Sequence, residues 1–244
     1  MIYEYLQRGV ASGAVAGIAY GIYMMFVGHP LSEYVHDAGH DHGAHAHENA
    51  GHAVSETTTA IVSAGSGLLW AILLGGVFAL ALYFLEPALP GPDGVKTYVL
   101  AGAGFLTVSA VPWLVLPPAA PGAEQLYAVE SRLAMYLGLV VLGAITAAAA
   151  IVAYKRAADR SIGLGVVAGA VPILAVVIVV PLATPTITTH PELSGELVSA
   201  YQALAALSQA AIWLLIAGTF NALRRRTSRF EDEPTPPDAE ALAG

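Results

Sequence analysis

The chain has 244 residues, of which 56% are hydrophobic and only 11% are charged, and its formal net charge is −8. A soluble domain usually carries about a quarter charged residues, so this composition excludes an ordinary soluble globular protein and indicates an integral membrane protein. The chain has no cysteine, which excludes disulfides, thiolate metal sites and iron–sulfur clusters. The acidic balance gives no sign of nucleic-acid binding; it suits attraction of cations, and equally adaptation to high salt.

Six apolar runs are each long enough to cross a bilayer as a helix. Backbone groups in lipid must pair within their own segment, so we predict an all-α, polytopic transmembrane bundle. The first run begins with "MIYEYLQRG", which has one Arg and one Glu, and no clear cleavage site follows it, so we interpret it as a retained helix and not a signal peptide. The predicted spans are 7–28, 57–85, 97–116, 133–154, 162–182 and 200–223.

The distribution of Lys and Arg predicts that both termini are cytoplasmic. In that orientation the outer segments are 29–56, 117–132 and 183–199, and Arg132 is the only Lys or Arg in them. The inner segments carry the other nine: Arg8, Lys96, Lys155, Arg156, Arg160, Arg224, Arg225, Arg226 and Arg229. We therefore divide the chain into a membrane domain, 1–226, and a disordered acidic cytoplasmic tail, 227–244.

The first outer segment contains "HDAGHDHGAHAHENAGH", with six of the eight histidines of the chain. Imidazole is a common ligand of Zn, Ni, Co and Cu ions, and carboxylates can complete the coordination. We predict a loose metal-capture loop, which small Gly and Ala spacers keep adaptable. Its candidate ligands are His36, Asp37, His40, Asp41, His42, His45, His47 and His52.

Two other interpretations of this stretch stay open: a solvated loop without a metal, and a pH sensor, because histidine titrates near neutral pH. A flexible histidine loop follows the Irving–Williams order and prefers Cu and Ni over Co. The loop alone therefore cannot select cobalt. The outer segments also hold nine acidic residues against one arginine, and this negative field would concentrate cations near the entrance.

His190, in "TPTITTHPELSGE", is a further candidate metal ligand, which could form a second coordination point with the histidine loop; an ordinary loop before a capped helix is the alternative. Glycines recur every fourth residue from Gly9 to Gly21, a spacing that favours close helix packing over substrate contact. Pro112, Pro172 and Pro181 are expected to kink their helices and free backbone carbonyls. No Walker A sequence, nucleophile elbow or H-E-x-x-H motif is present, so the sequence does not point to an enzyme.

Four stretches together resemble the CbtA-like family of probable cobalt transporter subunits. The Gly/Ala-rich first helix leads into the histidine loop, and "VPWLVLPPAAPGAEQLYAVESR" is similar to the family's Leu-Pro-Pro and Pro-Gly loop before an Arg. "VPLATPTITTHPELSGELVSAYQ" and "SQAAIWLLIAGTF" are similar to the family's last outer loop and last helix. The family is often described with five spans, whereas this sequence predicts six.

The resemblance implies cobalt uptake and a small histidine-containing partner, a CbtB-like membrane subunit. We therefore predict an inner-membrane subunit of a divalent cation importer, with Co²⁺ as the substrate ion and Ni²⁺ and Zn²⁺ as alternatives. Membrane lipids are its surroundings, and homo-oligomers are left open. The alternative function is a metal-sensing or metal-chaperoning membrane protein with no transport path of its own.

Overall fold

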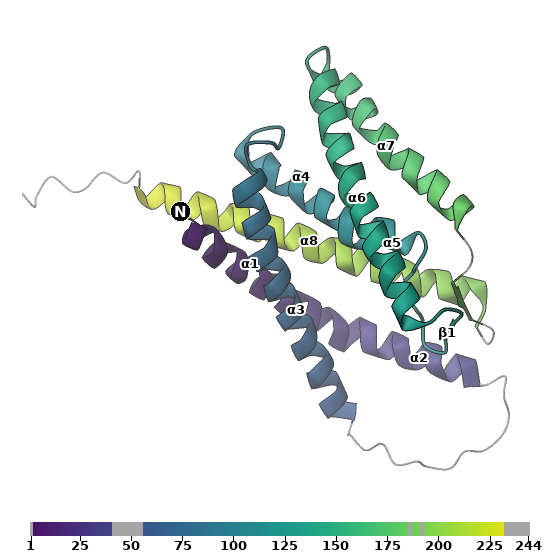
Figure 1. The fold of residues 1–244 in the computed structure, drawn as a ribbon. Coiled ribbons are helices and arrows are strands. Elements are labelled where there is room, and N and C mark those ends of the chain that lie inside the picture. Colours follow the sequence, from purple (N-terminus) through teal and green to yellow (C-terminus); the bar gives the residue numbers. More distant parts are fainter. Residues whose placement is uncertain (1, 41–55, 185–186, 191–192, 232–244) are drawn as a thin grey trace, which may run out of the picture.

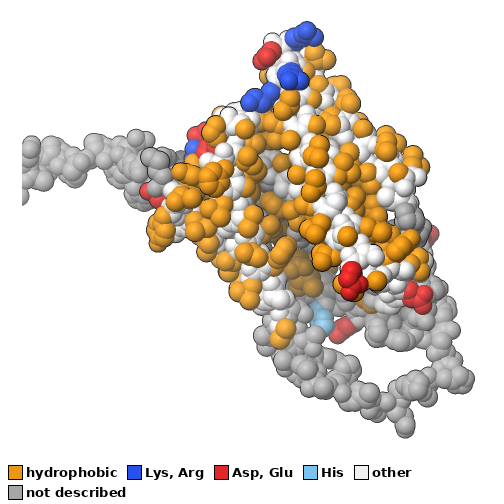
Figure 2. Space-filling model, viewed as in Figure 1, with side chains coloured by type: hydrophobic (Ala, Val, Ile, Leu, Met, Phe, Trp, Pro, Cys, Tyr) orange, Lys and Arg blue, Asp and Glu red, His pale blue; other side chains and the backbone are white. Residues whose placement is uncertain are grey.

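The computed structural model describes residues 2–40, 56–184, 187–190 and 193–231. Six helices in these ranges are long and apolar enough to cross a membrane, which confirms the predicted helical bundle. They are Ile2–Val35, Gly65–Leu85, Asp93–Trp113, Val129–Ala158, Ile162–Ala183 and Gly195–Arg226. Figure 2 shows hydrophobic side chains over the flank of the bundle and charged ones at its ends, as expected of a protein surrounded by lipid.

The first span is one nearly continuous helical rod, composed of α1 (Ile2–Tyr23), the π-helical turn η1 (Met24–Gly28) and α2 (His29–His40). Its length differs from the prediction, which places the start of the outer loop at residue 29. The helical hydrogen bonds continue through the π turn, where the His29 N–H donates to Met24 O, and a side chain at Gly28 would collide with the Met24 side chain. Residues 29–40 of the predicted outer segment therefore continue the membrane helix.

α1 packs closely along α3 (Glu56–Leu85), as the glycine ridge predicts. A side chain at Gly13 would collide with the backbone of Ala71 and Ile72, and one at Gly75 would collide with the Gly9 carbonyl. These collisions mean that the two backbones approach each other at a distance that only small residues allow. These contacts support a role of the glycine ridge in helix packing and not in contact with a substrate.

The remaining helices divide into two groups, as Figure 1 shows. α8 (Gly195–Glu231) packs against α1 and against α4 (Asp93–Phe105), so these helices and α3 form one layer. α6 (Val129–Ala158) and α7 (Ile162–Ala183) form an antiparallel hairpin. This hairpin joins the rest of the bundle mainly through η2 (Leu106–Ala110) and α5 (Val111–Trp113).

Two apolar clusters hold these groups together. The larger cluster lies between α1, α3, α4 and α8 and includes Phe78, Leu100, Ile216 and Phe220, all almost fully buried. The Phe78 and Phe220 rings meet edge to face, with centroids 5.9 Å apart. A smaller cluster, which includes Val111, Leu139 and Ile187, attaches the hairpin and the segment after α7.

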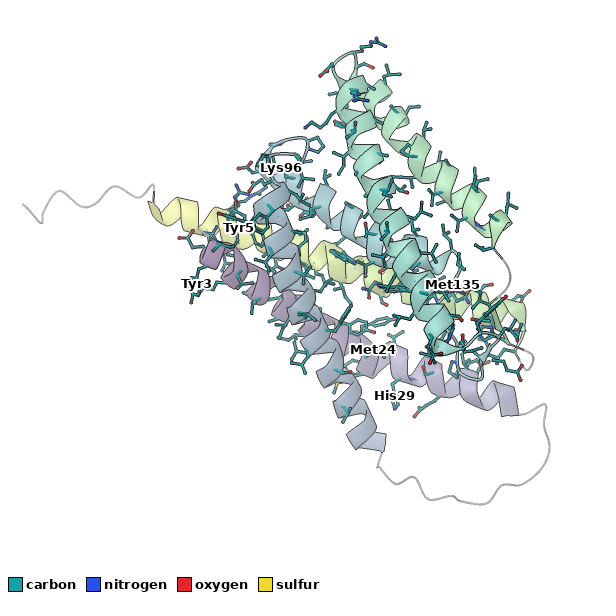
Figure 3. All side chains as sticks on the ribbon, viewed as in Figure 1. Tyr3, Tyr5, Met24, His29, Lys96 and Met135 are labelled. Atoms are coloured by element: carbon teal, nitrogen blue, oxygen red, sulfur yellow. The ribbon has the colours of Figure 1, made fainter. Side chains whose placement is uncertain are left out.

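The connections divide the bundle into two ends. We call the end that carries residues 86–92, residues 159–161 and Arg224 the arginine end, and the opposite end, where α2 and residues 114–128 lie, the histidine end. Figure 3 shows Tyr5 and Lys96 near the first of these and His29 near the second. The histidine end also carries the two-residue strands β1 (Glu124–Gln125) and β2 (Thr188–Thr189), which pair antiparallel.

Candidate metal-handling site

Some of the predicted metal ligands lie in parts of the chain that the structure describes, and the others lie outside them. His36, Asp37 and His40 belong to the last turns of α2, so His36 and His40 are separated by one helical turn and do not belong to an extended chain. This differs from the prediction, which places them in a loose loop. The other candidates of this segment lie outside the described residues: Asp41, His42, His45, His47 and His52.

α2 also carries His29, whose Nε2 lies 3.4 Å from Glu33 Oε1 across one turn of the helix. Both side chains are accessible, with 31% and 54% of their surface exposed, so a cation at this end could reach them. A histidine beside a carboxylate is a suitable pair of ligands for a divalent transition metal, but a pair alone gives a weak site. The sequence prediction did not include His29 or Glu33 among the metal ligands.

His190 lies immediately after β2, at the same end of the bundle. β2 pairs with β1, with Thr189 opposite Glu124, and Leu126 N–H donates to Ile187 O at 3.0 Å just beyond the pair. These bonds attach the segment before the last span to the loop before α6. Two of the three predicted outer segments are thereby joined.

The Nε2 atom of His190 is buried and has no hydrogen-bond partner among the residues that the structure describes. A buried polar atom without a partner is uncommon and calls for an unplaced ligand, water or ion. An imidazole nitrogen with a free lone pair is also the atom that would coordinate a metal. Within the part of the chain that the structure describes, however, no group of three or more His, Asp or Glu side chains is arranged to hold a metal ion.

The arginine end carries a polar cluster that the sequence did not predict. Arg224 on α8 donates from Nη1 to Glu86 Oε1 at 2.9 Å and from Nη2 to Asp93 Oδ2 at 2.6 Å. Tyr5 on α1 donates to the other oxygen of Glu86 at 2.6 Å, and Lys96 donates to Asp93 at 3.0 Å. No local sequence pattern connects Glu86 to Tyr5 or Arg224, because these partners are far away along the chain.

Two further bonds extend this cluster. Asn221, one turn before Arg224, is buried and donates to Gly94 O at 2.9 Å and to Thr97 Oγ1. Lys155 near the end of α6 donates to Ala88 O at 3.1 Å, which connects the hairpin to the same end. Five spans thus meet in polar contacts here, and the cluster fixes the ends of the helices relative to one another.

Pro112 leaves a backbone carbonyl of its helix without the usual N–H donor, as its position predicts. Because proline has no N–H, it cannot donate to the carbonyl one turn earlier, at Val108. The Tyr136 hydroxyl of α6 donates to that carbonyl at 3.2 Å. The freed group therefore becomes a link between α6 and the π-helical turn in the middle of the third span.

Comparison with known proteins identifies a family for this chain. The family model of CbtA, described as a probable cobalt transporter subunit, matches residues 2–225, which is nearly the whole chain. Searches of curated proteins and of solved structures found no match. A family of this kind is not a family of enzymes, and its membrane setting agrees with the six apolar helices. The chain therefore belongs to the CbtA family, the probable cobalt transporter subunits.

Proposed function

We propose that this chain is the metal-translocating subunit of a divalent cation importer in the cell membrane, with Co²⁺ as the physiological substrate. Its termini face the cytoplasm, and the histidine end faces outward. The distribution of Lys and Arg supports this orientation, since nine of these ten residues lie in segments that would be cytoplasmic.

The histidine-rich segment captures metal outside the membrane and raises its concentration near the bundle. The observation that carries this proposal is the unbroken helical rod from α1 to His40, because it positions His36 and His40 just beyond the first span. The His29–Glu33 pair lies two turns closer to the membrane on the same rod, and the buried Nε2 of His190 lies at the same end of the bundle. These groups supply a series of weak ligands from which an ion could be passed inward.

The histidine-rich segment supplies neither the driving force for uptake nor the selectivity for cobalt. A negative interior would favour entry of a dication by about 4.6 kcal/mol per 100 mV, twice the value for a unit charge. The sequence has no Walker A motif, so we do not assign ATP binding to this chain. Selection of cobalt over nickel and zinc requires a site in the helices or in a small CbtB-like membrane subunit, because a flexible histidine segment favours nickel.

Reconstitution in liposomes tests this function. Purified chain, alone and together with the CbtB-like subunit, is expected to accumulate radioactive cobalt in vesicles with an inside-negative potential, and competition with nickel and zinc would measure selectivity. Empty vesicles are the control. Cobalt that binds to the protein but never enters the vesicles, with or without the partner, would instead support a metal sensor or chaperone.

A further inference from the structure

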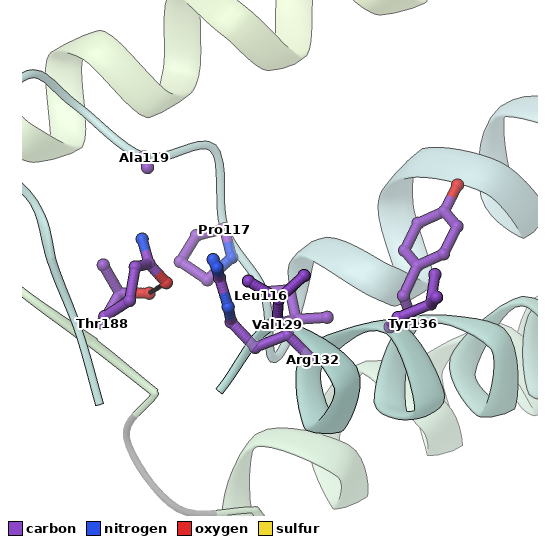
Figure 4. A pocket seen from close by; sticks show the side chains of 9 residues that line it. Leu116, Pro117, Ala119, Val129, Arg132, Tyr136 and Thr188 are labelled. Atoms are coloured by element: carbon purple, nitrogen blue, oxygen red, sulfur yellow. Dashed lines mark hydrogen bonds between the residues drawn. The ribbon is translucent and has the colours of Figure 1, made fainter. Parts of the chain in front are cut away.

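A cavity of about 380 Å³ opens at the histidine end, separate from the candidate metal ligands. Its walls come from the segment after α5, from both short strands and from the first two turns of α6 (Figure 4). The β1–β2 pair therefore forms one side of the cavity, and a membrane span forms the other. Its lining is Leu116, Pro117, Ala119, Gln125, Val129, Arg132, Leu133, Tyr136 and Thr188.

Arg132 is the charged residue of this cavity. Its side chain extends from the first turn of α6 toward Pro117 and Thr188, as Figure 4 shows. The Nε atom is buried and has no hydrogen-bond partner, and no ion pair joins Arg132 to any residue that the structure describes. Arg132 is half-buried, so an anion in the cavity could reach its guanidinium and supply a counter-charge. Its planar set of donors fits the oxygens of a phosphate or carboxylate group.

The polar neighbours of Arg132 are also donors. Gln125 contributes to the cavity, whereas its neighbour Glu124 is not part of the lining, since successive residues of a strand point to opposite sides. Thr188 Oγ1 donates to Gln125 Oε1 at 3.3 Å, so the amide nitrogen of Gln125 is left to donate elsewhere. The N-terminal end of α6 adds a partial positive charge, which Glu130 in the same turn partly offsets. The cavity thus combines a full cation, an amide donor and a helix N-terminus.

One rim of the cavity faces the surroundings of the bundle through apolar side chains. Val129 and Leu133 are 64% and 56% exposed, and they lie on the outer surface of a membrane span. A ligand with a charged head and an adjoining hydrocarbon chain matches this combination. At the end of a span, where lipid headgroups lie, such a ligand is a phospholipid.

We propose that the Arg132–Gln125 cavity binds a phosphate group, and that its source is the headgroup of an anionic phospholipid in the adjacent leaflet. Inorganic phosphate from the medium presents the same chemistry and is the other source that a test must distinguish. The bound phosphate would pair with the Arg132 guanidinium and the Gln125 amide. It would thereby stabilise the β1–β2 pair against α6 at the histidine end.

The test compares binding of dioleoyl phosphatidylglycerol, the corresponding diacylglycerol and inorganic phosphate to the full chain in a neutral detergent. Native mass spectrometry and the lipid-induced shift in melting temperature measure binding. Arg132→Gln is expected to weaken phosphatidylglycerol binding at least about tenfold, the scale of a lost charge-assisted hydrogen bond. Gln125→Ala is expected to weaken it less. Arg160→Gln, at an exposed arginine of the opposite end, is the matched control and should leave binding unchanged.

Each outcome decides the proposal. Binding of phosphatidylglycerol but not diacylglycerol, weakened by Arg132→Gln and unchanged in Arg160→Gln, supports the lipid source. Stabilisation by inorganic phosphate that depends on Arg132, with no preference for the phospholipid, supports a phosphate site filled from the medium. Equal binding by wild type, Arg132→Gln and Gln125→Ala overturns the proposal. If Arg132→Gln does not fold, Arg132→Lys and Gln125→Ala decide it in the same assay. The assay contains no cobalt, so its result is independent of the transport function.

Discussion

Arg224 on the last span places its Nη1 atom 2.9 Å from Glu86 Oε1, although the two residues are 138 positions apart in the sequence. The Glu86 side chain is only 15% exposed, and Arg224 simultaneously contacts Asp93 at the start of α4. One guanidinium therefore joins the end of α3 to the start of α4. The turn between these two helices is held in place by a residue of a third helix.

Arg224→Ala is expected to lower the free energy of unfolding by about 2 kcal/mol, because it leaves the Glu86 carboxylate partly buried without its cation. This is less than the ~3–5 kcal/mol of a fully buried pair, since both side chains retain some contact with solvent. Thermal unfolding in detergent measures the effect. Arg226→Ala, at an exposed arginine two positions later, is the control. Equal melting temperatures for the two variants would mean that the pair adds no stability.

Gly75→Leu is expected to disrupt the contact between α1 and α3, because its side chain would occupy the space of the Gly9 carbonyl and the Gly13 backbone. The cost should reach the upper part of about 1–3 kcal/mol for overpacking, since a backbone cannot move aside as a side chain can. Gly138→Leu is the matched control in another span, where a side chain would meet nothing within 4 Å. Yield of monodisperse protein and melting temperature are the measurements. Two variants that behave alike would contradict the close approach of the helices.

Tyr136→Phe removes the donor to the Val108 carbonyl, which Pro112 also leaves without an N–H one turn later. The expected loss of stability is about 1 kcal/mol, typical of one hydrogen bond between helices in a membrane. Tyr127→Phe, at a tyrosine that is 37% exposed, serves as the control. A double-mutant cycle with Pro112→Ala should show coupling, because an alanine N–H would supply the missing donor. Purely additive effects would show that the tyrosine does not compensate for the proline.

Replacement of His36, His40, His42, His45, His47 and His52 together by alanine tests the capture segment. We expect the apparent KM for cobalt uptake to rise about tenfold, which corresponds to about 1.4 kcal/mol, while the maximal rate is largely kept. The reason is that a loose collecting segment raises local metal concentration without forming the path itself. Uptake by liposomes over a range of cobalt concentrations measures both quantities. Abolished uptake at saturating cobalt would place these histidines in the path.

His190→Ala tests whether His190 contributes to transport independently of the collecting segment. Its buried Nε2 has no hydrogen-bond partner in the described part of the chain, so removal should cost little stability and should lower the maximal rate of uptake if the ion passes this nitrogen. His29→Ala, at an accessible histidine of the same end, is the comparison. A rate effect confined to His190→Ala supports a site near β2. A drop in melting temperature without any change in uptake would assign His190 a structural role.

The sequence by itself determined the membrane character, the number of spans and their approximate limits. Six long apolar runs have few other physical solutions, because a backbone in lipid must form its hydrogen bonds locally. The same locality explains why the glycine ridge on α1 and the effect of Pro112 could be predicted: both follow from spacing along one helix. The extension of the first helix to His40 was missed, because residues 29–40 are polar on average and so do not stand out as an apolar run, although their few apolar residues recur at helical spacing.

Only the tertiary structure decided which polar groups meet. The Tyr5–Glu86–Arg224–Asp93 cluster brings together four helices, and no local pattern connects residues so far apart. The same holds at the histidine end, where the β1–β2 pair joins two segments, and where His190 Nε2 and Arg132 Nε are buried with no hydrogen-bond partner among the described residues. Sequence spacing determines the features of a single helix, such as its length, its glycine ridge and its freed carbonyls. Contacts between helices depend on how the whole chain packs.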